Sequence, residues 1–417
     1  MIDLLLRSAP DWALAHAAPL LVMVPLVLAP VLTLVPSGRV AWFISIAGTA
    51  ASLVFSLILL AIVQTPETSG VVSYALGNWL PPLGIEFRVD ALNAMILVLV
   101  SAMGVLASIM SYPTVVAEIP KEKTSLFYSA FLACFAGLCG VAITGDAFNL
   151  FVFLEISSLS YGPSFVTMFL SATATKVALY ALIRFLFSVF NPQFVFESAA
   201  FVALLMPLGI AAMIACSFQA VFQTDVRRML AYSSVAQVGY MILGVSVGTA
   251  AGLSAGLFHL LNHAMIKGAL FMAVAGVVLT YKGTNIRDFA GLGRSAPWTM
   301  TAFAIAGLSL IGVPLTAGFQ SKMQLGYALF DNGWWWAVIL VVFSSFLAVI
   351  YIGRVLEAVF FQPPVNPRKT RKEAPIVLLV PLWILALANI FFGIATEIPL
   401  GLARDAAAAA FGLEMFR

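Results

Sequence analysis

Several ionisable residues of this sequence occur inside long apolar runs. The acids are Glu155 and Glu357, and the bases are Lys176, Arg184, Lys267, Lys322 and Arg354. A charge at the centre of a bilayer costs at least about 2.5–3.5 kcal/mol on insertion scales, so such residues persist where they are paired, hydrated or used. Carboxyl, amine and imidazole groups can each accept and release a proton, so these residues indicate proton transfer.

Three protonatable residues share one face of a single apolar run. His259, His263 and Lys267 are spaced four apart, which places them on the same side of a helix. We predict that they form part of a proton path, although a polar stripe that only joins helices is the alternative. The other members of the predicted relay are Glu155, Lys176 and Lys322.

One apolar run, residues 297–330, is too long for a single plain helix. It contains Gly312, Pro314 and Gly318, which should break the helix near its middle. Unwound backbone at membrane depth is tolerated only where it is buried in protein or faces water, and transporters use such breaks to build midplane sites. Lys322, just beyond the break, is therefore placed for a gate or a terminal relay.

Two further features have structural interpretations. Arg354 and Glu357 are three apart near one end of their helix, so we expect a local ion pair. Cys134, Cys139 and Cys216 lack the spacing of metal ligands, and no nucleotide, flavin or iron–sulfur motif is evident. We therefore expect no metal and no cofactor in this chain.

The elements that must position these residues are membrane helices. Of 417 residues, 62% are hydrophobic and 9% are charged, whereas soluble domains are roughly a quarter charged. This composition excludes a cytosolic enzyme, a disordered chain and a nucleic-acid binder. Apolar runs of about 20 residues predict an all-α polytopic membrane protein with about twelve helices. The predicted spans are 14–35, 40–63, 91–111, 124–144, 148–161 (short for a full span), 164–190, 200–222, 233–249, 254–280, 297–330, 334–361 and 374–394.

The basic residues between these spans predict the orientation of the chain. Alternate loops carry most of them: Arg39, Lys121, Lys123, Arg227, Arg228, Lys282, Arg287, Arg294, Arg368, Lys369, Arg371 and Lys372. The other side, with both termini, holds Arg7, Arg88, Arg404 and Arg417. Because positive loops stay in the cytoplasm, we expect both termini on the outer side of a bacterial inner (cell) membrane.

Five stretches of the sequence stand out as motifs. They are Thr144–Glu155 (TGDAFNLFVFLE), Thr175–Tyr180 (TKVALY), Gln223–Ser234 (QTDVRRMLAYSS), His259–Lys267 (HLLNHAMIK) and Pro314–Lys322 (PLTAGFQSK). In this order they resemble one superfamily, the antiporter-like membrane subunits shared by respiratory complex I and Mrp-type multisubunit sodium/proton antiporters. The motifs look closest to those of the Mrp D subunit, and the match covers about residues 80 to 370.

The resemblance implies a role for each relay residue. Glu155 matches the family's acidic residue, Lys176 its central lysine and Lys322 its terminal lysine on a discontinuous helix. His259, His263 and Lys267 match the linking polar stretch. The family fold is a bundle of inverted repeats with both termini outside, and its members work with other membrane subunits in hetero-oligomers.

One departure from the family pattern follows Ser160. The sequence passes directly to Tyr161 and Gly162, where the family has roughly two further helices. The usual partner of the acid at Glu155 therefore has no counterpart, and Lys176 could approach it across the Gly162–Pro163 turn. We expect one integral membrane domain over 1–417. Its parts would be N-terminal helices 14–111, a shortened first repeat 124–190, a second repeat 200–361, and a C-terminal helix and tail 374–417.

Three functional hypotheses follow. The favoured one is a proton-translocating subunit of a multisubunit cation/proton antiporter that exchanges Na+ for protons. The second is a membrane-arm subunit of a complex I-like NADH:quinone oxidoreductase or hydrogenase, with the redox chemistry in partner subunits. The third is a non-conducting structural subunit, which the shortened first repeat would favour. None of them involves nucleic acid.

Overall fold

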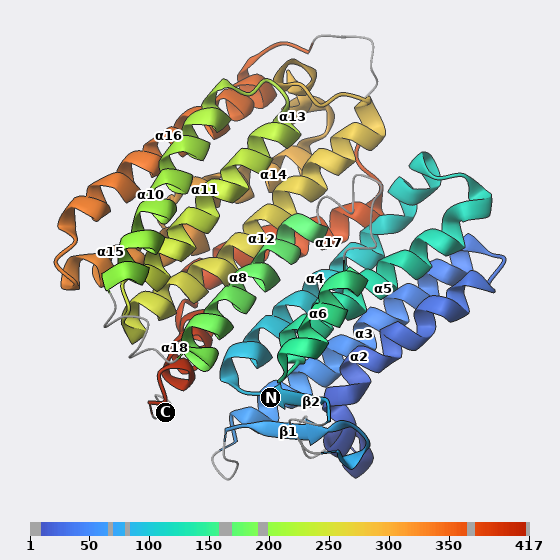
Figure 1. Ribbon diagram of the computed structural model, residues 1–417. Helices are drawn as coiled ribbons and strands as arrows, with labels where there is room; N and C mark the ends of the chain where they lie inside the picture. The colour runs from blue at the N-terminus through green and yellow to red at the C-terminus, as the bar shows by residue number, and fades with distance from the viewer. Residues whose placement is uncertain are drawn as a thin grey trace. The chain divides into compact units, whose positions relative to one another are not determined.

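The computed structural model of the chain describes residues 10–65, 70–79, 84–157, 169–190, 199–364 and 372–413. Within these ranges, ten helices are long and apolar enough to cross a membrane. The chain divides into two compact units (Figure 1). Of the described residues, unit 1 comprises those up to Arg184 together with Ala408–Leu413, and unit 2 comprises those from Phe185 to Ala407.

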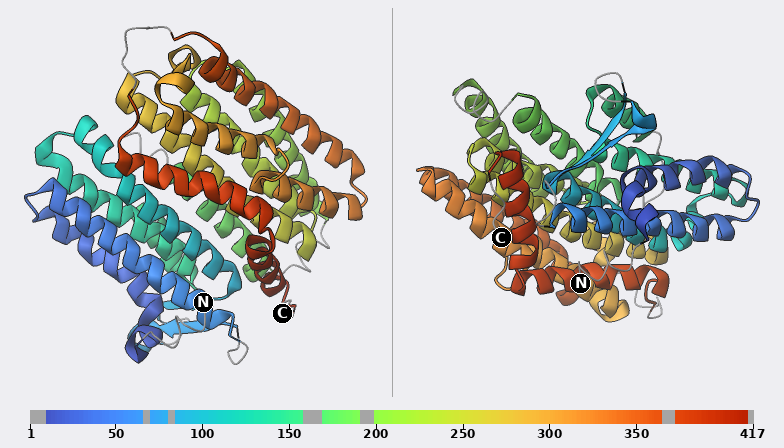
Figure 2. Two further views of the ribbon diagram at one scale, coloured as in Figure 1. Left: turned by 180° about the vertical axis from the view of Figure 1, so that it is seen from behind. Right: turned by 90° about the horizontal axis from the view of Figure 1, so that it is seen from below.

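Unit 1 is built mainly from helices. They are α2 (Asp11–Thr33), α3 (Gly38–Val63), α4 (Ala91–Glu118), α5 (Thr124–Ile143), α6 (Ala147–Ser157), α8 (Ala174–Arg184) and the 3-10 turns η1 (Leu76–Asn78) and η2 (Lys121–Lys123). Helices α2, α3 and α5 pack side by side, as both views of Figure 2 show. Glycines on α5 let α6 approach closely: a Cβ at Gly140 would lie 2.2 Å from the Phe153 ring.

A short hairpin at one end of unit 1 was not predicted from the sequence. Strands β1 (Val72–Ala75) and β2 (Glu86–Val89) pair antiparallel, with Val72 opposite Val89 (Figure 1). The hairpin leads into α4 through Asp90, whose carboxylate accepts hydrogen bonds from the backbone N–H groups of Leu92 and Asn93. This N-cap fixes the start of α4.

Unit 2 contains the remaining elements. They are η3 (Phe185–Val189), α10 (Ala199–Phe222), α11 (Val226–Ser246), α12 (Ala250–Tyr281), η4 (Ile286–Phe289), α13 (Leu292–Ser295), α14 (Pro297–Ile311), α15 (Ala317–Asp331), α16 (Trp335–Phe361) and α17 (Ile376–Ile394), and α18 (Glu397–Ala410) begins in it. Helix α12 packs against α11, α14, α15 and α17. It is therefore the central helix of the unit, and nearly all of its length is buried.

The predicted all-α membrane fold is confirmed, with corrections to the boundaries. Ten of the twelve predicted spans are long helices, and the other two are the short α6 and the broken pair α14–α15. Helix α11 begins at Val226 rather than at 233, because Asp225 caps a first turn that carries Arg227 and Arg228. Helix α4 continues past 111, through Pro113, to Glu118. The predicted tail after 394 contains α18.

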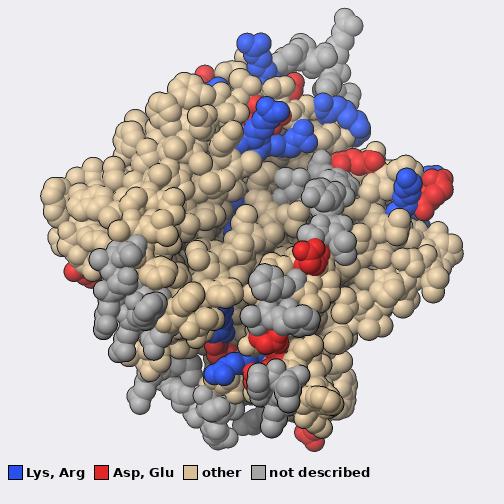
Figure 3. All heavy atoms as spheres, viewed as in Figure 1, with Lys and Arg blue, Asp and Glu red and all other residues tan. Residues whose placement is uncertain are grey.

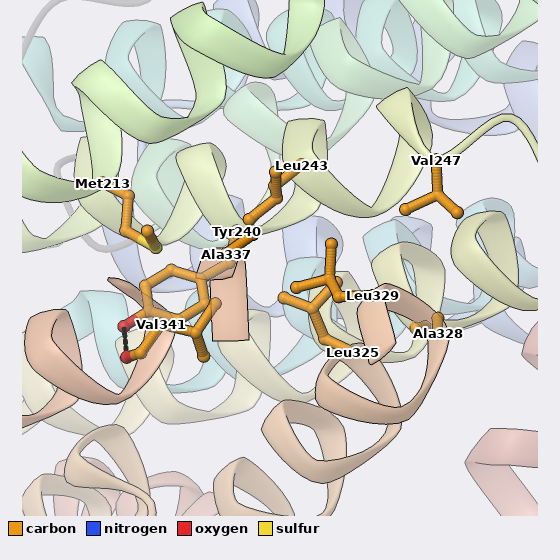
Figure 4. Packing of buried hydrophobic residues seen from close by; sticks show 10 residues of the cluster. Met213, Tyr240, Leu243, Val247, Leu325, Ala328, Leu329, Ala337 and Val341 are labelled. Carbon is orange, nitrogen blue, oxygen red and sulfur yellow. Dashed lines mark hydrogen bonds between the residues drawn. The ribbon is translucent and has the colours of Figure 1, made fainter. Parts of the chain in front are cut away.

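The apolar core of unit 2 includes a cluster between α10, α11, α15 and α16 (Figure 4). Its members include Met213, Tyr240, Leu243, Leu325 and Val341. The Tyr240 hydroxyl is satisfied inside this cluster, since it donates to the Val341 carbonyl at 3.2 Å. Helices α10 and α11 cross closely at two glycines, because a Cβ at Gly239 would lie 2.5 Å from the Gly209 carbonyl oxygen.

Basic residues gather at one end of unit 2. The loop before α11 and the loop after α12 are joined by backbone hydrogen bonds from Val226 to Thr284 and from Ile286 to Thr224. Basic residues flank these loops: Arg227 and Arg228 in the first turn of α11, Lys282 at the end of α12 and Arg287 in η4. On the face in Figure 3, many Lys and Arg side chains lie over the end of the helices near α13. This clustering agrees with the alternate-loop pattern in the sequence.

Candidate functional site

The polar face of α12 is buried inside unit 2. His259, His263 and Lys267 are each exposed by 1% or less. The two imidazole rings stack with 6.2 Å between their centres and 12° between their planes. The predicted shared face is therefore present, and it points into protein rather than toward lipid.

Lys267 lies at one end of this face. Its amino group donates to the Leu230 carbonyl at 2.7 Å and to the Ser233 hydroxyl, both on α11. A buried ammonium group needs such acceptors, because its desolvation is otherwise uncompensated. Helix α11 thus supplies the polar surroundings of this lysine.

His259 lies at the other end and has a partner at each ring nitrogen. Its Nδ1 lies 2.9 Å from the Ser321 hydroxyl on α15, and its Nε2 lies 2.9 Å from the Gln237 amide oxygen on α11. The Tyr240 ring flanks it, with 5.4 Å between the ring centres. His259 therefore joins three helices through side-chain contacts.

The predicted helix break is confirmed between α14 and α15. Gly312 ends α14 with a φ of 93°, and Leu315 has a φ of 71°. Pro314 lies between them and has no backbone N–H to continue the helix. The first turn of α15 lies very close to α14, because a Cβ at Gly318 would lie 1.8 Å from the Ser309 carbonyl oxygen.

Lys322 folds back from α15 onto the end of α14. Its amino group donates to the carbonyls of Leu310 and Ile311, each at 2.9 Å. These carbonyls belong to the last turn of α14, where the helix offers no N–H partner and carries partial negative charge. The break therefore creates the acceptors that hold this buried amine.

Tyr240 and Ser345 connect Lys322 to the polar face of α12. The Lys322 amino group lies 3.0 Å from the Ser345 hydroxyl and 5.3 Å from the centre of the Tyr240 ring. The two hydroxyls are 3.3 Å apart, and the same Tyr240 ring flanks His259. The structure thus brings Lys267, His263, His259 and Lys322 into one polar row within unit 2.

Lys176 belongs to unit 1 and is fully buried. Its amino group donates to the Ser171 carbonyl and to the Thr175 hydroxyl. One turn further along α8, the Tyr180 hydroxyl donates to the Ala142 carbonyl at 3.0 Å. Arg184, two turns along, donates through Nε to that hydroxyl at 2.8 Å. Lys176, Tyr180 and Arg184 thus form a polar face of α8, with Lys176 nearest its N-terminus.

Glu155 contradicts the expectation of a buried acid, because it is exposed on α6. Helix α6 faces α5 through Phe153, which packs on Gly140. A residue two positions further lies about 200° around a helix of 3.6 residues per turn, on the opposite face. The predicted approach of Lys176 across the Gly162–Pro163 turn lies outside the described residues.

The predicted ion pair between Arg354 and Glu357 is wrong. The Arg354 guanidinium donates to the Val221 and Gln223 carbonyls at the end of α10. Glu357 instead accepts a hydrogen bond from Gln362. The unpaired carbonyls at a helix C-terminus attract the arginine away from its neighbour on the same helix.

Arg184 makes an ion pair that the sequence did not predict. Its Nη1 lies 2.7 Å from the Asp90 carboxylate at the start of α4. The sequence offers no signal for this pair, since a partner 94 positions away leaves no local pattern. The pair ties α8 to α4 within unit 1.

The uncharged members of the row were also missed. Ser233, Gln237 and Tyr240 are four and three apart on α11, so they share one helix face. This polar spacing was the available signal, although only tertiary packing shows that the face meets α12. For metal binding, we find no group of three or more His, Cys, Asp or Glu side chains in the described ranges.

Three comparisons identify proteins similar to this chain. Residues 157–348 match the family model described as NADH:quinone oxidoreductase/Mrp antiporter, transmembrane. The NADH-quinone oxidoreductase subunit N of Desulforudis audaxviator is 32% identical over 92% of this chain and 96% of its own length. That alignment spans 490 positions, more than this chain contains, so the relative has residues without a counterpart here. The D subunit of the Bacillus subtilis Na(+)/H(+) antiporter is 24% identical over 84% of this chain and 88% of its own length.

Solved structures share the fold. A chain of the Mrp complex from Dietzia has a TM-score of 0.83 at 20% identity and covers 96% of this chain and 98% of its own. A chain of the archaeal membrane-bound sulfane sulfur reductase has a TM-score of 0.84 at 24% identity, with the same coverage. Together with the oxidoreductase relative, these findings show that this multi-pass membrane protein belongs to the NADH:quinone oxidoreductase/Mrp antiporter transmembrane family.

Proposed function

We propose that this chain carries protons within a multisubunit membrane assembly. The observation that supports the proposal best is the buried row of Lys267, His263, His259 and Lys322. Each of these side chains can bind and release a proton. Burial destabilises the charged form of each group, so a group that binds the proton can readily pass it to the next group.

The favoured setting is a cation/proton antiporter in which Na+ is exchanged for protons. Lys176 would bring protons to the row, and Lys322 at the helix break would deliver them. Glu155, which is exposed on α6, would be a further proton-carrying residue of this setting. The similarity to the D subunit of a Na(+)/H(+) antiporter supports this setting.

A second setting is supported by the higher identity to an NADH-quinone oxidoreductase subunit N. There the same row would move protons in response to redox chemistry in partner subunits. In both settings the partners are other membrane subunits, and both termini lie on the outer side of the bacterial membrane. The two settings therefore differ in the energy source and not in the proton path.

Purification of the native assembly separates these settings. An epitope-tagged chain is isolated in mild detergent, and the co-purifying subunits are identified by mass spectrometry. The assembly is then reconstituted in vesicles with a pH-sensitive dye. Proton movement driven by a Na+ gradient, without redox subunits, is expected for the antiporter. Proton movement that requires NADH and quinone would assign the chain to the redox setting, and none under either condition would contradict the proposal.

A further inference from the structure

The partners of His259 differ in what they can donate. Gln237 presents its amide oxygen to Nε2, and an oxygen of this kind only accepts a hydrogen bond. Nε2 must then carry a hydrogen. The remaining nitrogen, Nδ1, faces the Ser321 hydroxyl, which can either donate or accept. The contacts of His259 are therefore asymmetric.

Ser321 has a second acceptor available. Its hydroxyl also lies 3.1 Å from the Gly318 carbonyl oxygen, in the first turn of α15. A hydroxyl has one hydrogen, so it can donate to His259 Nδ1 or to the Gly318 carbonyl, but not to both. The first arrangement suits a neutral imidazole. The second leaves the hydroxyl oxygen free to accept from a protonated Nδ1.

From this geometry we infer that Gln237 and Ser321 are positioning residues that make Nδ1 of His259 the nitrogen at which the proton enters and leaves. The inference rests on the proposed function and names the residues that act at one of its steps. Gln237 keeps the hydrogen on Nε2, whereas the Ser321 hydroxyl rotates between the imidazole and the Gly318 carbonyl. Proton exchange thus occurs on the side of the ring that faces Ser321 of α15.

The charged and titratable groups around His259 come from three helices. His263 stacks on it from α12, Tyr240 flanks it from α11, and Lys322 on α15 lies over the same Tyr240 ring. Helices α14 and α17, which also pack on α12, contain no ionisable side chain. A positive charge on Lys322 therefore disfavours a positive charge on His259. Ser321, which contacts His259, is the residue before Lys322 in the chain.

The test measures the protonation of His259 directly. The chain has three histidines, His16, His259 and His263, so labelling with 15N-histidine gives few signals. Solid-state NMR of the reconstituted assembly then distinguishes the imidazolium from each neutral form, and His16→Gln and His263→Gln variants assign the signals. We expect a neutral form of His259 that carries its hydrogen on Nε2.

Removing either partner should disfavour the charged form. At the pH where half of wild-type His259 is protonated, Gln237→Met and Ser321→Ala should each lower the ratio of imidazolium to neutral imidazole about tenfold, as expected for a lost hydrogen bond to a charged group. Ser321→Thr keeps the hydroxyl and should restore the wild-type ratio. Gln237→Glu adds a negative acceptor and should raise the ratio.

Matched controls come from the same helices. Ser246→Ala removes a buried hydroxyl that donates to the Leu243 carbonyl of α11, and Gln320→Met removes an amide that donates to the Gly393 carbonyl. Both should leave the His259 ratio unchanged. If Gln237→Met and Ser321→Ala also leave it unchanged, or if the neutral form carries its hydrogen on Nδ1, the inference is overturned.

Proton flux distinguishes this failure from a failure of the proposed function. Gln237→Met should slow proton flux more at pH 8 than at pH 6. The variant lowers the fraction of charged His259, and that loss limits flux most at high pH, where few protons are available. If the NMR ratios shift as expected but His259→Ala and Lys322→Ala leave flux intact, the positions of Gln237 and Ser321 are upheld and the proton path is rejected. If flux depends on Lys322 but the ratios do not shift, only the inference about Gln237 and Ser321 is lost.

Discussion

The amino group of Lys322 lies 5.3 Å from the centre of the Tyr240 ring, across the interface of α15 and α11. Ser345 on α16 is within hydrogen-bond distance of both side chains. A cation is attracted to the negative face of an aromatic ring, most strongly where water is excluded. The ring therefore stabilises the charged lysine, while the hydroxyls connect it to the rest of the row.

Tyr240 variants separate these two contributions. Tyr240→Phe keeps the ring but loses the hydroxyl, so we expect proton flux to fall about fivefold, the effect of one hydrogen bond worth about 1 kcal/mol. Tyr240→Leu removes the ring as well and should reduce flux further. Dye-detected flux in reconstituted vesicles measures both. Equal flux in wild type and both variants would show that Lys322 acts without the tyrosine.

The close approach of α14 and α15 makes Gly318 intolerant of a side chain. A Cβ there would meet the Ser309 carbonyl oxygen at 1.8 Å, so the first turn of α15 must move. We expect Gly318→Ala to lower the melting temperature of the purified chain and to abolish flux by displacing Lys322. Gly353→Ala on α16 is the control, since a Cβ there meets no atom within 4 Å. It should leave the melting temperature unchanged or raise it, because alanine favours helix by about 1 kcal/mol.

Arg354 should contribute to stability through α10 rather than through Glu357. Arg354→Met leaves the Val221 and Gln223 carbonyls without their donor and should destabilise the chain by about 1.5–3 kcal/mol. Glu357→Gln should have little effect, and the double variant should match Arg354→Met alone. Chemical denaturation in detergent measures all three variants. Strong coupling between the effects of the two substitutions on stability would instead support the ion pair between Arg354 and Glu357 that was predicted from the sequence.

Asp225 gives the loop before α11 a defined dependence on pH. Burial acts to raise the pKa of its carboxyl, but hydrogen bonds from Thr284 and from the backbone N–H groups of Arg228 and Arg227 hold that pKa below its ordinary value. Because the pKa is depressed in the folded state, the carboxylate contributes stability above the unfolded pKa, about 3.9. That contribution is lost as the pH falls through the folded value.

Asp225→Asn should therefore lower the melting temperature at pH 7, and the difference from wild type should shrink below about pH 4. Asp225→Ala also removes the helix cap and should cost about 1 kcal/mol at every pH. Thermal unfolding followed by circular dichroism across this range checks both variants. A difference between wild type and Asp225→Asn that grows in acid would contradict this sign.

The helix break could be predicted from the sequence because its cause is local. Gly312 and Pro314 impose their backbone preferences wherever they occur, and the face shared by His259 and Lys267 follows from helical spacing. The acceptors of Lys322 could not be predicted, since they are backbone carbonyls that only the folded break exposes. Gln237 and Ser321 carry no charge and were missed for that reason.

The two errors have a common origin in packing. Glu155 was expected to be buried because the surrounding run is apolar. However, Phe153 packs on Gly140 of α5, so the face of α6 opposite Glu155 is the buried one. Arg354 was paired with its nearest acid, whereas the end of α10 offers better acceptors. Sequence patterns thus identified the spans and the four ionisable residues of the row, and tertiary contacts decided which partners these residues have.

Proton flux through the reconstituted native assembly is the most direct test of the proposed row. Lys267→Ala and Lys322→Ala are compared with wild type and with Lys123→Ala, which removes an exposed lysine in η2. Flux is driven by the assembly's own energy source, and equal incorporation of the variants is checked by subunit content. We predict that both buried-lysine variants lose flux at least tenfold while Lys123→Ala retains it. Full flux in assembled Lys267→Ala and Lys322→Ala would contradict a proton path through these side chains.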